Sequence, residues 1–384
     1  MSHPKPGKIL LFSEIFPPVH GGSGRWFAEI YKRFPKNSVV FLVGAHERSQ
    51  EYDADSVHRI FRDNLNSPEW GIRSVKGSSF YFRLWRTLRR AVREEGVRTI
   101  HCGRVLPEGF AALLLHKTDG IPYSCYVHGE DVEASLTSRE FTWMTRRVLK
   151  GADTIVSNSN NTLRILTEKW GLDPSRVIVM HPGVDVEHFS PRTDVPMPPG
   201  WQGRTVVLTV GRLQKRKGHD MMIRALPGLV ERRPDLLYAI VGGGEELVAL
   251  QSLVDELGLN NHVQFMGAAD DENMANAYRH CRLFALPNRR VGSDDEGFGM
   301  VLLEAQACGK PVLAGDSGGT SETLVEGKTG VLVDCTSPGP LQAAVVKLLA
   351  CDEQLDQMGR AAREHVEVRF SWENLAETAQ RHFL

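Results

Sequence analysis

The sequence contains no uninterrupted apolar run that approaches the ~20 residues needed to cross a bilayer. Its N-terminal segment has neither a long apolar core nor a cleavage-site pattern, so we expect no signal peptide. The six cysteines form no close C-x-x-C pair, which argues against a zinc site and favours buried, reduced thiols. We therefore expect a cytoplasmic protein.

An excess of charge of one sign is also missing. The 384 residues include 46 Lys and Arg against 47 Asp and Glu, a formal net charge of −1, so global charge gives no reason to expect nucleic acid as a partner. Short internal repeats and low-complexity tracts are absent as well. The hydrophobic content of 41% is that of an ordinary globular protein, and the length favours two domains of roughly 150–200 residues.

Short apolar or β-branched runs alternate with helical patterns along the whole chain. The predicted strands are Lys8–Ser13, Val39–Gly44, Arg98–Cys102, Tyr123–Val127, Thr154–Asn158 and Val177–Met180 in the first half, and Thr205–Gly211, Leu237–Gly242, His262–Gly267, Leu283–Pro287, Pro311–Gly315 and Gly330–Asp334 in the second. Buried strands that alternate with helices predict two doubly wound α/β domains on parallel sheets.

A segment with four prolines and no periodicity, residues 188–203, is typical of a linker. It separates a first domain, 1–187, from a second, 204–368, and the closing segment 369–384 has the pattern of an amphipathic helix. Ligands of open parallel sheets bind at the carboxyl ends of the strands. We therefore expect a cleft between the two domains, lined by strand-to-helix loops.

Two loops of the first domain follow predicted strands and carry candidate site residues. Gly21, Gly22 and Gly24 precede a helix, where they either bring the backbone close to an anionic ligand or form a plain turn. This loop lacks the G-x-G-x-x-G spacing of a dinucleotide site. His128 directly follows a buried strand. It can be a base, a hydrogen-bond donor or a structural residue, and its place at the end of a strand favours a function.

In the second domain, four cations crowd the loop GRLQKRKG that follows the strand Thr205–Gly211: Arg212, Lys215, Arg216 and Lys217. An arginine and a lysine five positions apart, ahead of a glycine at a helix start, can clamp a diphosphate, because arginine gives bidentate contacts and lysine a compact charge. A solvated basic turn is the alternative, and spacing alone does not separate the two.

Glu296 and Glu304 lie eight positions apart, the first in an acidic loop and the second in a helix from about Gly299 to Cys308. Eight helical steps span ~12 Å, whereas the carboxyls of a glycoside-hydrolase pair are ~5–9.5 Å apart. Carboxylates are natural acceptors for sugar hydroxyls, and the backbone N–H groups of Phe298 and Gly299 form an anion-friendly helix start. The pattern favours a ligand clamp over an acid/base pair.

The segment Phe80–Arg98 combines Arg83, Arg86, Arg89, Arg90 and Arg93 with aromatic and leucine residues. A basic amphipathic helix of this kind can rest on an anionic membrane, which would make the protein peripheral on the inner face of the cytoplasmic membrane. Alternatively, it is a surface helix that packs its apolar stripe on the sheet.

Six motifs together resemble glycosyltransferase family 4, retaining enzymes of the GT-B fold, over nearly the whole length. They are HGGSG (His20–Gly24), HGED (His128–Asp131), HPGVD (His181–Asp185), GRLQKRKG (Gly211–Gly218), EGFGMVLLEAQACGKPV (Glu296–Val312) and SGGTSE (Ser317–Glu322). The resemblance implies two Rossmann-like domains facing across a cleft, with the C-terminal helix crossing back to the first. It also implies a nucleotide-sugar donor and no required metal.

The resemblance further implies roles for individual residues. Arg212 and Lys217 would hold the nucleotide diphosphate and stabilise its charge as the glycosidic bond breaks. Glu304 would bind the ribose hydroxyls, while Glu296 and His128 would contact the donor sugar. The other implied donor-binding residues are Gly22, Gly243, Met266, Phe298, Gly299 and Met300, and the acceptor-side candidates are His20, Gly21 and Arg25. The stretch PNRRVGSDDEGFG departs from the family pattern by an arginine pair and an acidic pair, to which no contact is assigned.

The residues of the motifs HGED, HPGVD and EAQACGKPV are similar to those of bacterial phosphatidylinositol mannosyltransferases and related lipid or exopolysaccharide glycosyltransferases. This implies GDP-mannose, or a UDP-hexose, as donor and a lipid-linked or carbohydrate acceptor, joined in the α configuration. A Rossmann oxidoreductase or epimerase would need the missing G-x-G-x-x-G, and a non-catalytic binder would have lost its clamp residues. A nucleotide-sugar hydrolase stays open as an alternative.

Overall fold

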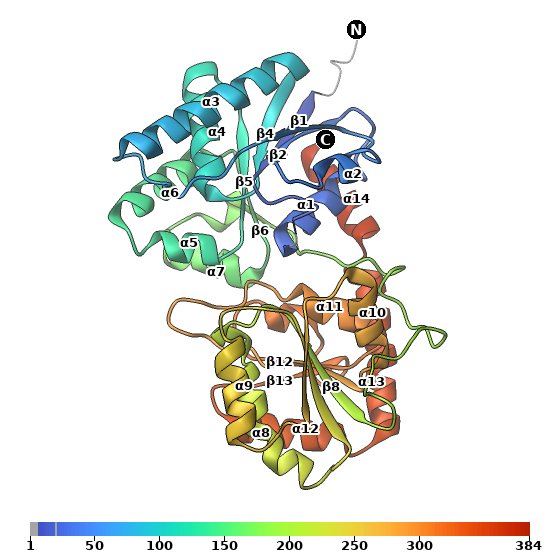
Figure 1. The fold of residues 1–384 in the computed structure, drawn as a ribbon. Coiled ribbons are helices and arrows are strands. Elements are labelled where there is room, and N and C mark those ends of the chain that lie inside the picture. The colour runs from blue at the N-terminus through green and yellow to red at the C-terminus, as the bar shows by residue number, and fades with distance from the viewer. Residues whose placement is uncertain (1–6, 20) are drawn as a thin grey trace. The chain divides into compact units, whose positions relative to one another are not determined.

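The structure is a computed structural model that describes residues 7–19 and 21–384. The chain divides into two compact units (Figure 1). The first comprises Met1–Pro182 and Trp372–Leu384, and the second comprises Gly183–Ser371. Each unit is built on one parallel sheet with helices on its faces, which is the predicted fold class.

The sheet of the first unit has the strand order β3-β2-β1-β4-β5-β6-β7 among the described residues, and every pairing in it is parallel. The strands are β1 (Lys8–Ser13), β2 (Val39–Gly44), β3 (Arg59–Asp63), β4 (Val97–Cys102), β5 (Tyr123–Val127), β6 (Thr154–Ser157) and β7 (Val177–Val179). Because β1 pairs with both β2 and β4, the chain leaves β1 in one direction and later continues in the other. The carboxyl ends of β1 and β4 therefore form the switch point of this sheet.

Helices cover both faces of the first sheet (Figure 1). They are α1 (Gly22–Tyr31), α2 (Ser49–Asp53), α3 (Val75–Glu95), α4 (Phe110–Asp119), α5 (Glu130–Ser135), α6 (Arg139–Gly151), α7 (Asn160–Glu168) and α14 (Trp372–Phe383). Residues of α3, α4 and α6 share one buried core with β1, β4 and β5. The last helix, α14, packs against α1, and the ring of Phe383 lies 4.5 Å from that of His101 on β4.

The sheet of the second unit has the order β10-β9-β8-β11-β12-β13 and is likewise parallel throughout the described residues. Its strands are β8 (Thr205–Val210), β9 (Leu236–Val241), β10 (Val263–Gly267), β11 (Leu283–Leu286), β12 (Val312–Gly315) and β13 (Gly330–Val333). Its helices are α8 (His219–Val230), α9 (Leu247–Glu256), α10 (Asp271–His280), α11 (Met300–Ala307), α12 (Pro338–Leu348) and α13 (Asp352–Arg369).

Side chains of the second sheet alternate between two cores. Leu208 of β8 packs in the core shared with α10 and α11, whereas Val207 packs in the core shared with α8 and α12, as expected for a strand buried on both faces. The proline-rich segment 188–203 belongs to this unit, because Phe189 and Trp201 are buried in the first of these cores.

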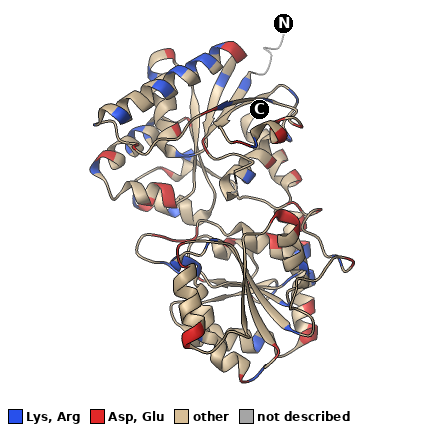
Figure 2. Cartoon of the chain, in the orientation of Figure 1, with Lys and Arg blue, Asp and Glu red and all other residues tan. Residues whose placement is uncertain are grey.

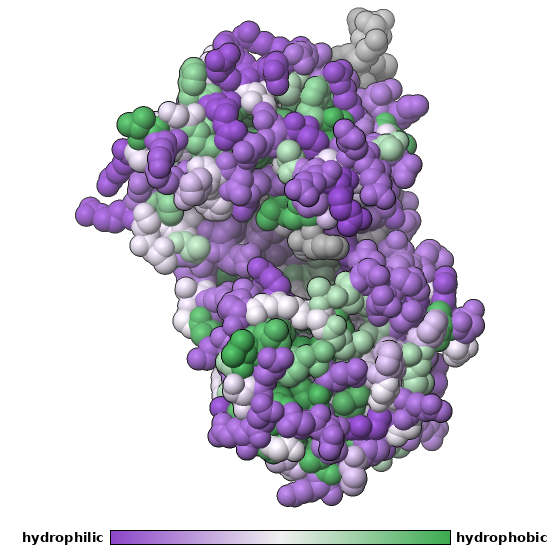
Figure 3. Space-filling model, in the orientation of Figure 1, coloured by the Kyte–Doolittle hydropathy of each residue, from purple (hydrophilic) through white to green (hydrophobic). Residues whose placement is uncertain are grey.

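Hydrophobic residues on the face shown in Figure 3 are interspersed with hydrophilic ones. Within residues 7–19 and 21–384, no helix combines the length and apolar character required to cross a bilayer. All six cysteines are free, and five of them are buried, which confirms the prediction of buried thiols.

Candidate functional site

The loop GRLQKRKG connects the end of β8 to the start of α8. Its Lys215–Lys217 segment forms one short 3-10 turn, and Gly218 follows at φ 76°. A Cβ at Gly218 would lie 1.8 Å from the carbonyl oxygen of Pro287, so glycine is required for the loop to approach the end of β11. Of the four cations, Arg216 and Lys217 are buried, whereas Arg212 and Lys215 are exposed. A fully solvated basic turn is therefore excluded.

Arg216, Lys217 and Glu296 form a buried ionic cluster at this edge of the sheet. The Lys217 Nζ lies 2.6 Å from the Glu296 Oε2, and the Arg216 guanidinium donates to the same oxygen. Arg216 Nε lies 3.2 Å from Asp294 Oδ1. Two of the predicted site residues, Lys217 and Glu296, thus meet although they lie on different loops.

Burial and charge act in opposite directions on the Glu296 carboxyl. Burial raises its pKa, but the charges of Lys217 and Arg216 outweigh that effect and hold the pKa below its ordinary value. Burial lowers the pKa of the Lys217 ammonium, and Glu296 opposes this effect only in part. The neighbouring cations therefore favour the ionised form of the Glu296 carboxyl.

The two glutamates of the sequence motif are held by different elements. Glu304 is buried in α11, where its Oε2 accepts a hydrogen bond of 2.8 Å from the hydroxyl of Tyr278 on α10. Glu296 lies before the helix and pairs with the cations of the β8 loop. Gly299 has φ 93° at the helix start, where a Cβ would lie 3.1 Å from Leu302 Cδ1. The two carboxylates therefore have separate partners on separate elements.

The acidic and basic pairs that depart from the family pattern anchor the loop of Glu296. Arg289 donates from both terminal nitrogens to Asp220, at 2.8 Å each, which ties the loop to α8. Asp295 Oδ1 accepts from the backbone N–H of Glu296 and from the hydroxyl of Ser317. The carbonyl of Glu296 in turn accepts from the N–H of Gly319. Ser317 and Gly319 of the SGGTSE motif therefore help to fix the backbone at Asp295 and Glu296.

The remaining predicted donor-side residues of this unit lie at the same edge of the sheet or at the start of α11. Gly243 follows β9, and its carbonyl accepts a 3.0 Å hydrogen bond from the N–H of Leu213 in the cationic loop. Met266 lies at the end of β10 and is half-buried. Phe298 is buried, and Met300 is the first residue of α11.

His128 lies just past β5 in the first unit. Its Nε2 is 2.8 Å from the carbonyl oxygen of Gly103, so Nε2 carries the proton in this arrangement. The imidazole ring packs edge-on against Trp26 and Phe27 of α1, and the backbone N–H donates to Asp131. The strand end, the helix and the loop together fix the orientation of His128.

The glycine-rich loop contributes the start of α1. Gly21 and Gly22 are exposed, and α1 begins at Gly22, two residues earlier than expected. Arg25 is half-buried in its first turn. His20 lies outside the described residues.

A second ionic cluster, which sequence reasoning missed, lies at the switch point between β1 and β4. Arg104 pairs with Glu14, which follows β1, and with Glu108, whose carboxylate also accepts a 2.9 Å hydrogen bond from the Glu14 N–H. The guanidinium stands 5.0 Å above the ring of Trp70. Burial raises the pKa of the Glu14 carboxyl, and Arg104 opposes this only in part. The signal in the sequence is that Glu14 comes one residue after β1 and Arg104 two residues after β4, its neighbour in the sheet.

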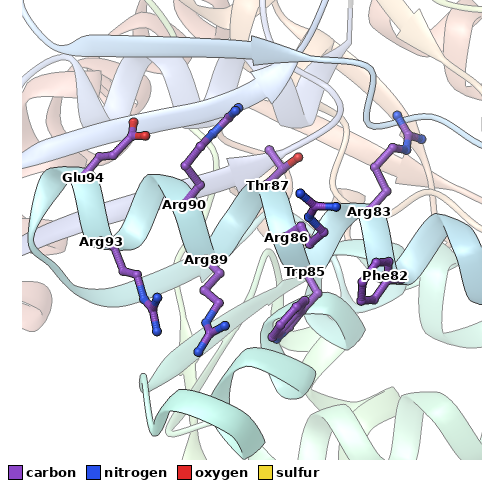
Figure 4. Close-up of a pocket in the computed structure, with 9 residues that line it drawn as sticks. All are labelled: Phe82, Arg83, Trp85, Arg86, Thr87, Arg89, Arg90, Arg93 and Glu94. Atoms are coloured by element: carbon purple, nitrogen blue, oxygen red, sulfur yellow. The ribbon is translucent and has the colours of Figure 1, made fainter.

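The basic helix α3 has one face on the core and one in solvent. Phe80, Tyr81, Leu84 and Leu88 are buried, so the apolar stripe packs on the sheet. The outer face forms a groove of about 790 Å³ (Figure 4). It is lined by Phe82, Arg83, Trp85, Arg86, Thr87, Arg89, Arg90, Arg93 and Glu94.

Not all arginines of this groove are neutralised. Arg89 and Arg93 project from the same side of α3 and pair with Asp119. For Arg86 and Arg90, by contrast, the described residues provide no ion pair or hydrogen bond, and the side chain of Phe82 beside them is exposed. Figure 2 shows the resulting accumulation of basic residues on this helix.

Two family models match the chain, one in each half. The model described as "Glycosyltransferase Family 4" matches residues 20–188, and the one described as "Glycosyl transferases group 1" matches residues 197–365. Their meeting point lies close to the boundary between the two units.

Characterised relatives match over almost the full length. The chain is 33% identical over 377 residues to a GDP-mannose-dependent alpha-(1-6)-phosphatidylinositol monomannoside mannosyltransferase of Mycolicibacterium smegmatis, covering 95% of each chain. It is 30% identical over 382 residues to a GDP-mannose-dependent monoacylated alpha-(1-6)-phosphatidylinositol monomannoside mannosyltransferase of Corynebacterium glutamicum, covering 96% of each.

Solved structures share the architecture at lower identity. Anabaena HepE in complex with UDP aligns with a TM-score of 0.78 at 18% identity, covering 98% of this chain and 99% of that one. Sucrose-phosphate synthase of Thermosynechococcus elongatus aligns at 0.77 with 20% identity, covering 98% of each chain. At these identities the likeness establishes the GT-B fold. Because the first half of the chain matches the family model and the relatives match end to end, the chain belongs to glycosyltransferase family 4 and is a hexosyltransferase.

Proposed function

We propose that this enzyme transfers mannose from GDP-mannose to a hydroxyl group of a lipid-linked glycan, with retention of the α configuration and without a metal ion. The observation that carries the proposal is the buried Arg216–Lys217–Glu296 cluster at the carboxyl end of β8. The donor and acceptor classes are suggested by relatives whose names specify GDP-mannose and phosphatidylinositol mannosides.

In this proposal the second unit binds the donor. The Lys217 ammonium and the guanidinium of Arg212, which is exposed and has no ion pair within the described residues, neutralise the diphosphate. Glu304, oriented by Tyr278, accepts hydrogen bonds from the ribose hydroxyls, and Glu296 accepts one from the sugar. Further donor contacts are assigned to Gly22, His128, Gly243, Met266, Phe298, Gly299 and Met300.

The chemical step needs no protein nucleophile. The bond between the anomeric carbon and the diphosphate oxygen breaks, and the diphosphate leaves with both electrons. The acceptor hydroxyl attacks from the same face, and its proton passes to an oxygen of the leaving diphosphate. Lys217 and Arg212 stabilise the charge that develops on that diphosphate, the type of contribution that is often the largest in catalysis.

The first unit supplies the acceptor side. The cluster of Glu14, Arg104 and Glu108 holds two carboxylates against one arginine, so it has more capacity to accept hydrogen bonds from hydroxyl groups than to bind an anion. Gly21, directly before α1, and Arg25, in the first turn of α1, are the remaining acceptor-side candidates among the described residues.

Incubation of the purified enzyme with a phosphatidylinositol mannoside in detergent, and with either GDP-mannose or UDP-glucose, tests the proposal. We expect a lipid one mannose heavier by mass spectrometry, with one GDP released per product. Transfer from UDP-glucose alone would overturn the assigned donor. GDP release without a heavier lipid would favour the hydrolase.

We also propose that the outer face of α3 contacts an anionic membrane surface. Unpaired Arg86 and Arg90 provide charge that anionic headgroups would complement, and the exposed side chain of Phe82 can enter the interface. Each arginine near an anionic surface contributes about 1 kcal/mol to binding.

Co-sedimentation with liposomes of phosphatidylglycerol and phosphatidylcholine at low salt tests this contact. The double variant Arg86→Glu/Arg90→Glu should bind about tenfold more weakly or worse. Arg282→Glu, on the second unit, changes the net charge by half as much as the double variant, serves as a control for the position of the change, and should bind as the wild type does. Equal binding of all three proteins, or of wild type to neutral liposomes, would contradict the proposal.

A further inference from the structure

Arg216 is the buried cation of the GRLQKRKG loop to which the proposed mechanism gives no role. Its side chain is 5% exposed. Its Nη1 donates to Glu296 Oε2, and its Nε lies 3.2 Å from Asp294 Oδ1. Arg216 therefore bridges two carboxylates of the acidic loop.

Arg216 and Lys217 compete for the same carboxylate oxygen. Both cations contact Oε2 of Glu296, Lys217 at 2.6 Å. No hydrogen bond from any described residue reaches the other oxygen, Oε1. The pairing thus leaves one oxygen of Glu296 available to a ligand while the other is shared by two positive charges.

The two cations differ in how firmly they are fixed. The carbonyl of Arg216 accepts a 2.8 Å hydrogen bond from the N–H of Arg289, whose guanidinium is held by Asp220 on α8. The Arg216 fork is further engaged by Asp294. The Lys217 ammonium has one ionic partner, Glu296, on a flexible four-carbon stem. Lys217 is therefore the cation that can move to a new partner.

We infer that Arg216 is a positioning residue: it remains the counter-ion of Glu296 so that Lys217 can move to the donor diphosphate and Oε1 of Glu296 can accept a hydroxyl of the donor sugar. This inference rests on the proposed function. A buried carboxylate without a cation is strongly unfavourable. Without Arg216, Lys217 would be retained by Glu296 and withdrawn from the diphosphate.

Calorimetric titration with GDP tests the inference. Arg216→Gln should weaken GDP binding about tenfold or more, because the charge-assisted contact of Lys217 is lost. Adding Glu296→Gln to that variant should restore the affinity to that of Glu296→Gln alone, since Lys217 is then released. Restoration by removing a second charged residue is an outcome that a merely structural arginine cannot produce.

A purely structural role predicts a different pattern. Arg216→Gln would then lower the melting temperature with GDP affinity unchanged, or the two substitutions would weaken binding additively, and either result overturns the inference. Arg216→Lys keeps a positive charge but loses the guanidinium, whose separate nitrogens contact Glu296 and Asp294. If Arg216→Gln does not fold, an unchanged GDP affinity in Arg216→Lys overturns the inference, and weaker binding supports it.

A matched control is available in the same unit. Arg282 also pairs with two carboxylates, Asp352 and Asp356, and Arg282→Gln should leave GDP affinity unchanged. A wild-type protein that fails to bind GDP would contradict the proposed function itself. Normal GDP binding by both the wild type and Arg216→Gln would contradict only the role of Arg216.

Discussion

The two units place ionic clusters of different composition at the carboxyl ends of their sheets. In the second unit, Arg216 and Lys217 both contact the buried carboxylate of Glu296, and Arg216 also contacts the more exposed Asp294. In the first, Glu14 and Glu108 surround the single guanidinium of Arg104. The same type of fold therefore places two cations on one buried carboxylate at one edge, and two carboxylates on one guanidinium at the other.

The difference is visible in one glutamate of each cluster, the half-buried Glu14 and the buried Glu296. Burial raises the pKa of Glu14, with Arg104 opposing and Glu108 adding to the rise. Burial also acts to raise the pKa of Glu296, but there Lys217 and Arg216 reverse the direction. The number of cations within reach, rather than burial alone, decides whether a glutamate at such an edge is held in its ionised form.

Removing Lys217 from the ionic cluster of the second unit should have the largest effect on turnover. Lys217→Ala should lower kcat about 100- to 1000-fold, the usual result of losing one contact to developing charge. Steady-state assay of GDP release in the presence of acceptor measures this. Lys215→Ala removes an exposed cation from the same loop and should leave kcat near that of the wild type. Near-normal turnover in Lys217→Ala would remove the proposed role of this lysine.

The comparison extends to one buried histidine in each unit. Burial lowers the pKa of His101 to about 3 and that of His219 to about 4. In the unfolded chain a histidine has a pKa of about 6.5, so as the pH falls the unfolded state takes up protons before the folded state does. The free energy of unfolding should therefore fall as the pH drops from about 6.5 toward the lower pKa values of the folded protein. The expected slope is about 1.4 kcal/mol per pH unit for each proton.

Thermal unfolding from pH 7 to pH 4, followed by calorimetry, measures this slope. His101→Gln should flatten the pH dependence of the transition of the first unit, and His219→Gln that of the second. If the units unfold together, both variants should flatten the single transition. An unchanged slope in both would show that the two histidines do not cause the loss.

A change in the cluster of Glu14, Arg104 and Glu108 should affect the binding of the acceptor and not that of the donor. Glu14→Gln removes the carboxylate proposed to accept an acceptor hydroxyl, and should raise the acceptor KM about tenfold without changing GDP affinity. Glu29→Gln, a change on α1 that breaks an ion pair with Arg33, is the matched control. A rise in the KM for GDP-mannose, with the acceptor KM unaltered, would place Glu14 on the donor side instead.

An exposed ion pair should have the smallest effect. Glu373 of α14 pairs with Arg33, and their side chains are 62% and 22% exposed. Glu373→Gln should therefore lower the free energy of unfolding by about 1 kcal/mol or less. Urea denaturation measures it, and a much larger loss would mean that α14 depends on this pair more than on Trp372 and the other buried residues on its inner face.

Most of the strand framework was predictable from sequence, because buried parallel strands form continuous apolar runs. The strands Lys8–Ser13 and Tyr123–Val127 agree with the structure at both ends. The edge strand β3, Arg59–Asp63, was missed because only its two central residues are apolar and none of its residues is buried. Residues 188–203 were expected to form a linker, since proline content does not reveal that Phe189 and Trp201 are buried.

The candidate site was predictable where a motif marks one loop, and not where two loops combine. Lys217 and Glu296 were identified separately, but their pairing joins loops about eighty positions apart and required the structure. Arg216 could not be distinguished from Lys215 by sequence, because only the fold decides which side chain of the turn is buried. Glu14 and Arg104 were overlooked because they lie on two different loops, which only the fold brings together.

The division of the chain has a consequence for biosynthesis. The second unit is one continuous segment, Gly183–Ser371, whereas the first is assembled from Met1–Pro182 and Trp372–Leu384. On a ribosome, which delivers the chain from its N-terminus, the second unit is therefore complete before α14 has emerged. Until then, the surface of α1 against which α14 packs, and the ring of His101 that Phe383 contacts, stay uncovered. The unit whose synthesis starts first is finished last, and this nascent stage is where a chaperone would find exposed apolar surface.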